Sequence, residues 1–329
     1  MKAFSYTEAT APNAAATAVA ADRQAMFFAG GTTLVDLMKI EVLTPAKLVG
    51  VRRLPFSGID VSDDAVRVGA NVTNSELAWH PVIRDRYPVL SEAILSGATT
   101  QLRNMATVAG NIMQRTRCAY FRDVHAACNR RRPKSGCDAI DGFNRGHAVL
   151  GTSEHCIATH PSDMCVALVI LNAVVHTLKA DGATRAIPFA DFHLIPGDTP
   201  ELEVILEHAE LITHVTLPQQ PLARRSHYLK VRDRASYEFA LTSAAVALDL
   251  DGPTIREARV GLGGVATKPW RSHEAERVLT GQPASEGTFR AAAEAALAGA
   301  IGRRHNQFKI ELATRTLVRA LGTARDLNR

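Results

Sequence analysis

Four of the five cysteines in this 329-residue chain lie within 39 consecutive positions, and this crowding restricts the possible folds more than any other feature. The spacing is Cys-x9-Cys-x8-Cys-x18-Cys, formed by Cys118, Cys128, Cys137 and Cys156. Residues 112–146 are rich in arginine and glycine, lack apolar periodicity, and are too many for an ordinary connection. So few cysteines in a chain of this length exclude a disulfide-dense scaffold. We therefore predict an inserted loop that something other than a hydrophobic core organises.

Four thiolates can bind either one tetrahedral zinc ion or a 4Fe–4S cluster. Zinc modules usually use close Cys-x2-4-Cys pairs, and the sequence contains none. Wide spacing of single cysteines suits a cuboidal cluster, and Gly136, Gly142 and Gly146 could supply turns and amides near sulfur. Zinc, and four unrelated reduced cysteines, remain alternatives at this point. The fifth cysteine, Cys165, falls among apolar residues of a predicted helix and is expected to be a core thiol.

The positive charge of the chain is concentrated in the same loop. The net charge is +5, and residues 115–137 contain seven basic residues against one acid, Asp123. Such a loop can bind nucleic acid, or it can offset the negative charge of a thiolate-bound cluster. A nucleic-acid-binding zinc module would also need interleaved aromatic rings, and the loop offers only Tyr120, Phe121 and Phe143. A basic zinc module with four cysteine ligands is therefore kept as an alternative, and the main expectation is a protein that binds no nucleic acid.

The sequence gives no indication of a membrane span. No apolar run reaches the roughly 18–20 residues that cross a bilayer. Residues 1–5 lack the apolar core of a signal peptide, and no twin-arginine leader occurs there. By its own sequence the chain is expected to be cytoplasmic, and a location in the periplasm would require export on the leader of a partner subunit.

Apolar patterning predicts an α+β protein in two parts, with a boundary near residue 220 at Pro218-Gln219-Gln220-Pro221. The first part begins with a small β-turn-α-β unit over 26–51, followed by a hairpin around Asp63-Asp64. Further elements of the first part are helices at 74–80, 87–96 and 162–172, a hairpin across 180–182 and a strand at 210–217. The second part is predicted to contain three antiparallel strands at 226–232, 239–250 and 255–265, then helices at 271–280, 286–300 and 306–322.

Two glycine-containing turns are candidates for binding a bulky anion. In Ala29-Gly30-Gly31-Thr32-Thr33 the glycines allow close backbone approach, and the following helix N-terminus attracts pyrophosphate. The motif is neither Gly-x-Gly-x-x-Gly nor a Walker loop, so a parallel-sheet nucleotide fold is not supported. The second turn is Ala106-Thr107-Val108-Ala109-Gly110-Asn111. Taken singly, the first could be an ordinary tight turn and the second a helix C-terminus closed by glycine.

In this order and spacing the two turns resemble the FAD subunits of the xanthine dehydrogenase and carbon monoxide dehydrogenase family. The resemblance covers the whole chain and extends to further short motifs, which are His160-Pro161-Ser162-Asp163, Glu210-Leu211-Ile212, Tyr228-x-Lys230-x-Arg232 and Gly263-Gly264-Val265-Ala266. It implies a vanillyl-alcohol-oxidase (PCMH)-type FAD-binding domain over residues 1–220, which carries the insert at about 112–157. A smaller C-terminal α+β domain, of the type found in CO dehydrogenase flavoproteins, is implied over 224–329.

The resemblance also implies which residues bind FAD. Those expected at the pyrophosphate are Phe28, Ala29, Gly30, Gly31, Thr32, Thr33 and Leu34, completed by Thr107, Gly110 and Asn111. Asp163 is expected near the ribityl chain or phosphates, Ile212 against the isoalloxazine ring, and Lys230 at the pyrimidine edge of that ring. The chain departs from some relatives at Gly97-Ala98-Thr99, where those proteins place an aromatic ring.

Within this family, the FAD subunits of periplasmic aldehyde oxidoreductases and of 4-hydroxybenzoyl-CoA reductases carry a four-cysteine insert at the same place. The resemblance therefore favours a 4Fe–4S cluster as the ligand of the four cysteines. It implies an electron-transfer subunit whose partners are a molybdopterin-containing large subunit, a small subunit with two 2Fe–2S clusters, and an external electron acceptor. Aldehydes or aromatic heterocycles would be oxidised at the molybdenum of the partner, so no catalytic residues are expected here. The alternative is a free-standing FAD-dependent oxidase or dehydrogenase.

Overall fold

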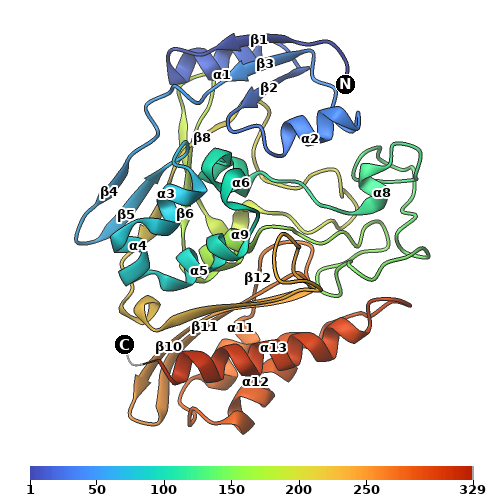
Figure 1. Ribbon diagram of the computed structural model, residues 1–329. Helices are drawn as coiled ribbons and strands as arrows, with labels where there is room; N and C mark the ends of the chain where they lie inside the picture. The colour runs from blue at the N-terminus through green and yellow to red at the C-terminus, as the bar shows by residue number, and fades with distance from the viewer. Residues whose placement is uncertain (328–329) are drawn as a thin grey trace.

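The computed structural model describes residues 1–327 of the chain. Figure 1 shows two sheets and their helices in the upper part of the molecule and a third sheet, backed by helices, in the lower part. The cysteine-containing insert lies at the side, next to both parts. The α+β class predicted from the sequence is confirmed.

The first sheet is parallel and contains three strands in the order β1 (Ser5–Glu8), β3 (Lys47–Gly50), β2 (Ala25–Phe28). Helix α1 (Pro12–Ala20) packs on it through buried small residues, and α2 (Leu34–Lys39) follows β2. The predicted β-turn-α-β unit is therefore confirmed as β2-α2-β3. It places the first glycine turn at the end of a parallel strand, where the chain enters a helix.

The second sheet is antiparallel and forms the centre of the upper part. Its five strands follow the order β4 (Ile59–Val61), β5 (Ala65–Gly69), β8 (Leu211–Pro218), β6 (Val174–Leu178), β7 (Thr184–Pro188). The largest apolar core joins this sheet to its helices and encloses Cys165, which confirms the prediction of a core thiol. The helices are α3 (Asn74–Trp79), α4 (Pro81–Arg86), α5 (Pro88–Ser96), α6 (Thr100–Met105), α7 (Val108–Ile112), α9 (Asp163–Ile170) and α10 (Phe189–Phe192).

After a short 3-10 turn, η1 (Pro221–Arg224), the chain forms a third sheet with its own core. The strands lie in the order β12 (Trp270–Arg271), β11 (Thr254–Gly263), β10 (Thr242–Asp251), β9 (Ser226–Val231). Alanine-rich faces of the covering helices pack closely on it. Those helices are α11 (His273–Leu279), α12 (Glu286–Leu297) and α13 (Phe308–Arg325). The predicted three-stranded sheet thus gains a fourth strand, which is too short to show any periodicity.

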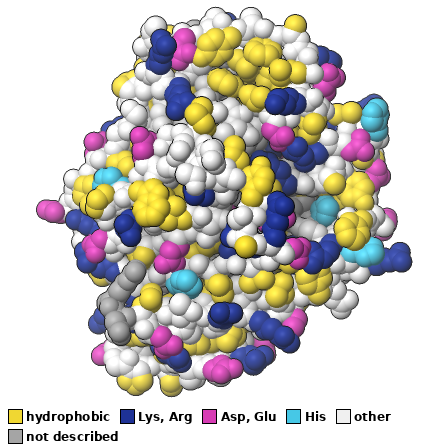
Figure 2. Space-filling view, viewed as in Figure 1, with side chains coloured by type: hydrophobic (Ala, Val, Ile, Leu, Met, Phe, Trp, Pro, Cys, Tyr) yellow, Lys and Arg dark blue, Asp and Glu magenta, His cyan; other side chains and the backbone are white. Residues whose placement is uncertain are grey.

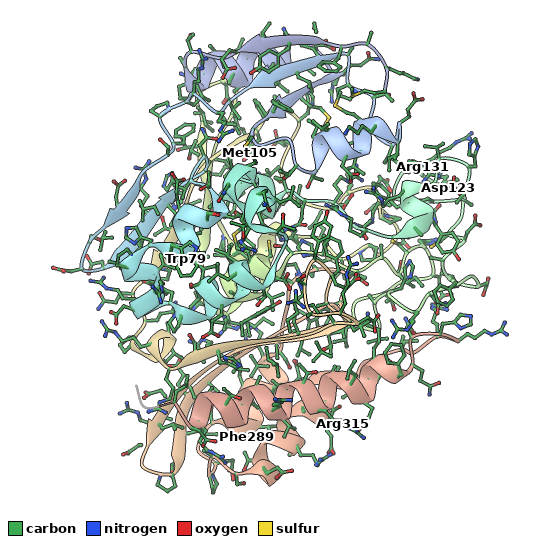
Figure 3. The ribbon with its side chains drawn as sticks, viewed as in Figure 1. Trp79, Met105, Asp123, Arg131, Phe289 and Arg315 are labelled. Carbon is green, nitrogen blue, oxygen red and sulfur yellow. The ribbon has the colours of Figure 1, made fainter. Side chains whose placement is uncertain are left out.

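The insert contains little regular structure, as predicted. Its one helix is α8 (Ala119–Arg122), and the rest is held by polar contacts. The side chain of Arg131 donates to the carbonyl groups of Tyr120 and Phe121, at 2.8 Å each, and so fastens α8 to the following turn (Figure 3). Within residues 1–327, none of the helices combines the length and apolarity that crossing a membrane requires.

Candidate functional site

The two glycine turns lie against each other. A Cβ atom on Gly30 would come within 2.0 Å of the carbonyl oxygen of Met105, directly before the second turn. Gly31 adopts a φ of 72°, which side chains rarely tolerate. In the second turn the Thr107 hydroxyl accepts from the amide of Gly110 (3.1 Å) and begins α7. The second turn is thus a helix N-terminus, not the helix C-terminus that remained an alternative, and both turns present helix starts.

Two cavities of similar size meet at these turns. The first, of about 590 Å³, lies between the parallel sheet and the second turn, and Ala29, Asn71, Thr107 and Ile212 are among its lining residues. The second, of about 580 Å³, lies between α5, α7 and β9. Thr32, Thr33 and Gly110 line both cavities. A long ligand with a central anionic group could therefore extend through both, with that group beside the two helix starts.

The predicted FAD-binding residues divide between these cavities. Gly30, Gly31, Leu34, Thr107 and Ile212 line the first cavity, whereas Asn111, Asp163 and Lys230 line the second. The ring of Phe28 packs against the first turn, so closely that a Cβ atom added to Gly31 would lie 2.9 Å from it. Ile212 and Lys230 were predicted to contact the same ring. Ile212 lines the first cavity and Lys230 the second, and the two cavities share Thr32, Thr33 and Gly110.

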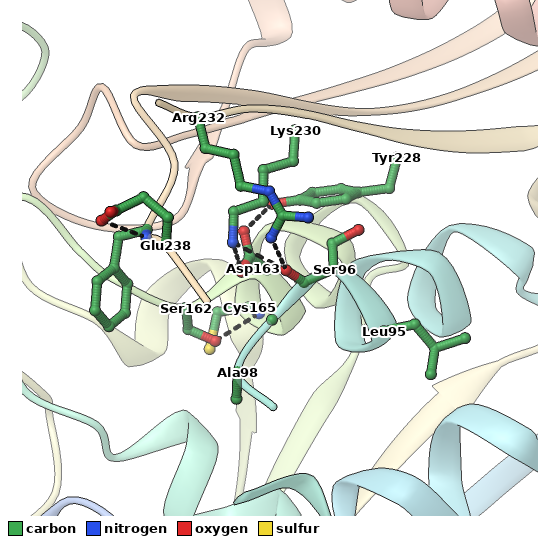
Figure 4. A network of polar contacts seen from close by, with 12 residues as sticks. Leu95, Ser96, Ala98, Ser162, Asp163, Cys165, Tyr228, Lys230, Arg232 and Glu238 are labelled. Atoms are coloured by element: carbon green, nitrogen blue, oxygen red, sulfur yellow. Dashed lines mark hydrogen bonds and ion pairs between the residues drawn. The ribbon is translucent and has the colours of Figure 1, made fainter. Parts of the chain in front are cut away.

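A buried ion pair forms the wall of the second cavity opposite the turns. Asp163, at the start of α9, accepts from Lys230 Nζ (2.8 Å) and from the Tyr228 hydroxyl (2.6 Å), both on β9 (Figure 4). The side chains of Lys230 and Asp163 are only 3% and 9% exposed. Burial, together with the charge of Asp163, raises the pKa of Tyr228 far above its ordinary value. Because the carboxylate balances the ammonium group, Lys230 does not offer an uncompensated positive charge to a ligand.

The segment that lacks the aromatic ring of some relatives also lines the second cavity. A Cβ on Gly97 would lie 3.2 Å from the Asp163 carboxylate, and Ala98 has a φ of 52°. Two aromatic residues face the same cavity from the loop after β9, namely Tyr237 and Phe239. Both are exposed, at 54% and 42%. Aromatic contact with a ligand can therefore come from the C-terminal part, which the sequence motifs did not reveal.

All four predicted metal ligands line one small cavity inside the insert. Cys128 and Cys137 are paired across a short antiparallel bridge, and Cys118 directly precedes α8. Zinc at 2.3 Å from four sulfurs would set those sulfurs roughly 3.8 Å apart. Among residues 1–327, no three of these sulfur atoms lie within 4.8 Å of one another. The four sulfur atoms are thus more widely spaced than the ligands of a single zinc ion.

Buried charges surround the sulfur atoms. Arg130, whose side chain is 6% exposed, donates to Glu203 (2.7 Å) and lies close enough to Cys156 to interact with its charge. Burial opposes the ionisation of Glu203, but Arg130 and Arg115 together lower its pKa. His147 Nε2 lies 3.1 Å from Cys118 Sγ, and burial lowers the pKa of His147 to about 4. The sequence motifs did not predict Glu203, because its partners are distant in the chain.

A second group of possible metal ligands lies in the core. Ligand atoms of His160, Cys165 and His193 come within 4.8 Å of one another. However, His160 Nδ1 accepts from the amide of Ser162 (3.3 Å), so that nitrogen carries no proton. A metal-bound histidine normally donates from its other nitrogen. We therefore interpret this group as packed core.

Comparison with known proteins finds two family models that together cover almost the whole chain. Residues 2–220 match the model of the FAD binding domain in molybdopterin dehydrogenase, and residues 227–324 match that of the CO dehydrogenase flavoprotein C-terminal domain. The chain is 50% identical over 326 residues to the aldehyde oxidoreductase FAD-binding subunit PaoB of Escherichia coli, with 99% of each chain covered. It is 25% identical to the carbon monoxide dehydrogenase medium chain of Hydrogenophaga pseudoflava, covering 83% of this chain and 78% of that one.

Solved structures share the fold. A chain of quinoline 2-oxidoreductase from Pseudomonas putida superimposes with a TM-score of 0.76 at 23% identity, covering 99% of both chains. A chain of carbon monoxide dehydrogenase from Hydrogenophaga pseudoflava gives 0.76 at 22% identity, with 98% of each covered. The chain therefore belongs to the family of FAD-binding oxidoreductase subunits of the molybdenum hydroxylases, which includes the xanthine and carbon monoxide dehydrogenases.

Proposed function

We propose that this chain is the electron-transferring subunit of an aldehyde-oxidising molybdenum hydroxylase, and that it binds both FAD and a 4Fe–4S cluster. In this proposal it receives electrons from the 2Fe–2S centres of a small subunit and passes them through FAD to an external acceptor. The substrate is oxidised in a molybdopterin-containing large subunit. The observation that carries the proposal is the pair of cavities joined at two helix starts, in a chain half identical to an aldehyde oxidoreductase subunit.

The two cavities support a specific orientation of FAD. The pyrophosphate would lie at Thr32, Thr33 and Gly110, since these residues line both cavities. The isoalloxazine ring would occupy the second cavity beside Lys230, and the adenosine end would occupy the first cavity beside Ile212. Bound flavin would supply the redox chemistry, whereas the chain holds the ring and sets the charge around it. We also infer a domain boundary near residue 220, with domains over 1–220 and 224–329.

Three features support a 4Fe–4S cluster in the insert. The four cysteines line one cavity, their sulfur atoms are spaced too widely for zinc, and the buried Arg130 lies near one of them, Cys156. A cluster with four thiolates carries negative charge, which Arg130 and the other arginines of the loop would offset. The insert has almost no core of its own, so a bound cluster would also be its main source of order.

The proposal is tested by purifying the chain under anaerobic conditions. We expect flavin absorption near 450 nm, a broad absorption near 400 nm, and about four iron and four sulfide ions per chain. Cys128→Ser should remove iron and sulfide and keep the flavin, whereas the control Cys165→Ser should keep both. Zinc in place of iron, or iron retained in Cys128→Ser, would refute the cluster assignment.

A second measurement distinguishes the proposed electron-transferring subunit from the alternative, a free-standing FAD-dependent oxidase. An aldehyde should not bleach the flavin of the isolated chain, because the proposal puts substrate oxidation in a partner. The same aldehyde should bleach it after the large and small subunits are added. Bleaching of the isolated flavin would favour an independent oxidase.

A further inference from the structure

A third cavity, of about 340 Å³, adjoins the second and is not used by the FAD orientation proposed above; of the four cysteines of the insert, Cys118 lines it. It continues directly into the second cavity, because both are lined by Arg117, Pro161, Asp163, Glu238 and Phe239. Its other lining residues come from the insert, from the start of α9 with the segment before it, and from the C-terminal part, and they include Phe143, Arg145 and Gly146 of the insert. Its size is that of a site for a small molecule.

The third cavity is open to solvent on the side away from the flavin cavity. Phe143 is 65% exposed, and Gly146 and Asp233 are also exposed. In Figure 2, basic and hydrophobic side chains lie next to one another on the face where the upper and lower parts meet. A small molecule could therefore enter this cavity without displacing the flavin.

The lining combines aromatic rings with a cation, Arg117, that makes no direct contact with a carboxylate of the described residues. The Arg117 guanidinium lies 5.3 Å from the centre of the Phe239 ring and donates to the carbonyl oxygen of Arg115 at 2.6 Å. Within residues 1–327 it forms no ion pair with a carboxylate at 4.0 Å or less. Arg145, in contrast, is paired with Asp233 at 2.6 Å. Arg117 therefore has donors left for an oxygen atom of a ligand in the third cavity.

From these contacts we infer that the third cavity binds the electron acceptor, and that this acceptor is a small quinone. The planar ring of a quinone could pack against Phe143 and Phe239. Its carbonyl oxygen, which becomes more negative as the ring is reduced, could accept a hydrogen bond from Arg117. The quinone takes two electrons and two protons from the reduced flavin and leaves as hydroquinone, while the flavin returns to its oxidised form. This inference rests on the proposed function, because it requires the flavin ring in the second cavity.

The test uses the complete complex with its flavin reduced by an aldehyde. After excess aldehyde is removed, stopped-flow absorbance at 450 nm follows flavin reoxidation by 1,4-benzoquinone. We expect the rate to saturate with quinone concentration, as binding before electron transfer requires. Phe143→Ala, and Gly146→Phe, whose Cβ meets no atom within 4 Å, should each raise the half-saturating concentration about tenfold.

Two controls make the result specific. Trp79→Ala removes an equally exposed aromatic side chain, 58% exposed on α3, and should leave quinone saturation unchanged. Ferricyanide, which needs no aromatic site, should reoxidise the flavin of all variants at the native rate. A rate that stays linear in quinone concentration, or saturation unaffected by both cavity variants, would overturn the inference. A complex without flavin would instead refute the proposed function.

Discussion

At the scale of single residues, the ion pair of Asp163 and Lys230 sets the charge of one wall of the second cavity. The sequence motifs predicted that both residues lie near flavin, but they did not predict that the carboxylate neutralises the ammonium group. That contact joins α9 to β9, and such pairing of distant segments has no local signal in the sequence. The charge that a ligand experiences is therefore a property of the pair and not of Lys230 alone.

Asp163→Asn should destabilise the protein by about 3–5 kcal/mol, because it leaves Lys230 buried without a counter-charge. In the flavin-loaded protein it should also raise the flavin potential, since the positive charge is no longer balanced. Thermal unfolding and spectroelectrochemistry measure the two effects. Adding Lys230→Met should recover part of the stability and return the potential toward the native value. An unchanged potential in Asp163→Asn would contradict the position proposed for the ring.

Arg130→Met should lower the potential of the proposed cluster, because it removes a buried positive charge that lies close to Cys156. An EPR-monitored redox titration measures this potential. Arg132→Met removes the same charge from an exposed position of the same loop and should change the potential much less. Equal shifts in the two variants would show that only the net charge of the loop matters.

At the scale of elements, the sequence predicted the strand, turn and helix order well wherever apolar periodicity is strong. It did not predict β1, whose residues are almost all exposed and whose place depends on parallel pairing with β3. It identified Gly30 correctly as a position that requires glycine, but for an incomplete reason. The missing side chain lets the first turn pack against the carbonyl group of Met105, so Gly30 aligns the two turns with each other.

Gly30→Ala should therefore abolish flavin retention, alone or with Thr107→Ala, because the first turn must move away from the second. The flavin-to-protein absorbance ratio after gel filtration measures retention. Gly299→Ala is a matched control, since its Cβ would meet no atom within 4 Å. Full FAD occupancy in the Gly30→Ala, Thr107→Ala double variant would refute the assignment of the two turns to the pyrophosphate.

At the scale of the whole molecule, the insert connects the two parts of the chain. On one side Arg122 forms an ion pair with Asp36 of α2 at 2.6 Å. On the other, the buried Lys309 of α13 donates to the carbonyl oxygens of Gly146 (3.2 Å) and His147 (3.0 Å). The sequence predicted the insert and its cysteines, but not these contacts, because they form only when distant segments have packed.

Lys309→Met should destabilise the protein by about 1–3 kcal/mol, since buried carbonyl groups lose their donor. Burial lowers the pKa of Lys309 to about 7, well below that of a lysine in the unfolded chain. The unfolded chain therefore binds the extra proton between these two pKa values, and Lys309 makes stability increase with pH from about 7 to about 10. Chemical denaturation at several pH values should show this increase in the native protein and a smaller one in Lys309→Met. Lys39→Met, at an exposed position, should preserve the native pH profile.

Because the insert lies between α2 and α13, the proposed cluster would link metal supply to the integrity of the whole subunit. A group bound by the four cysteines would stabilise only those conformations in which the loop is formed, and the formed loop contacts both parts of the chain. Iron starvation would then lower the free energy of unfolding of the whole subunit. The fraction of molecules lost to proteolysis would increase as the iron available to the cell decreases.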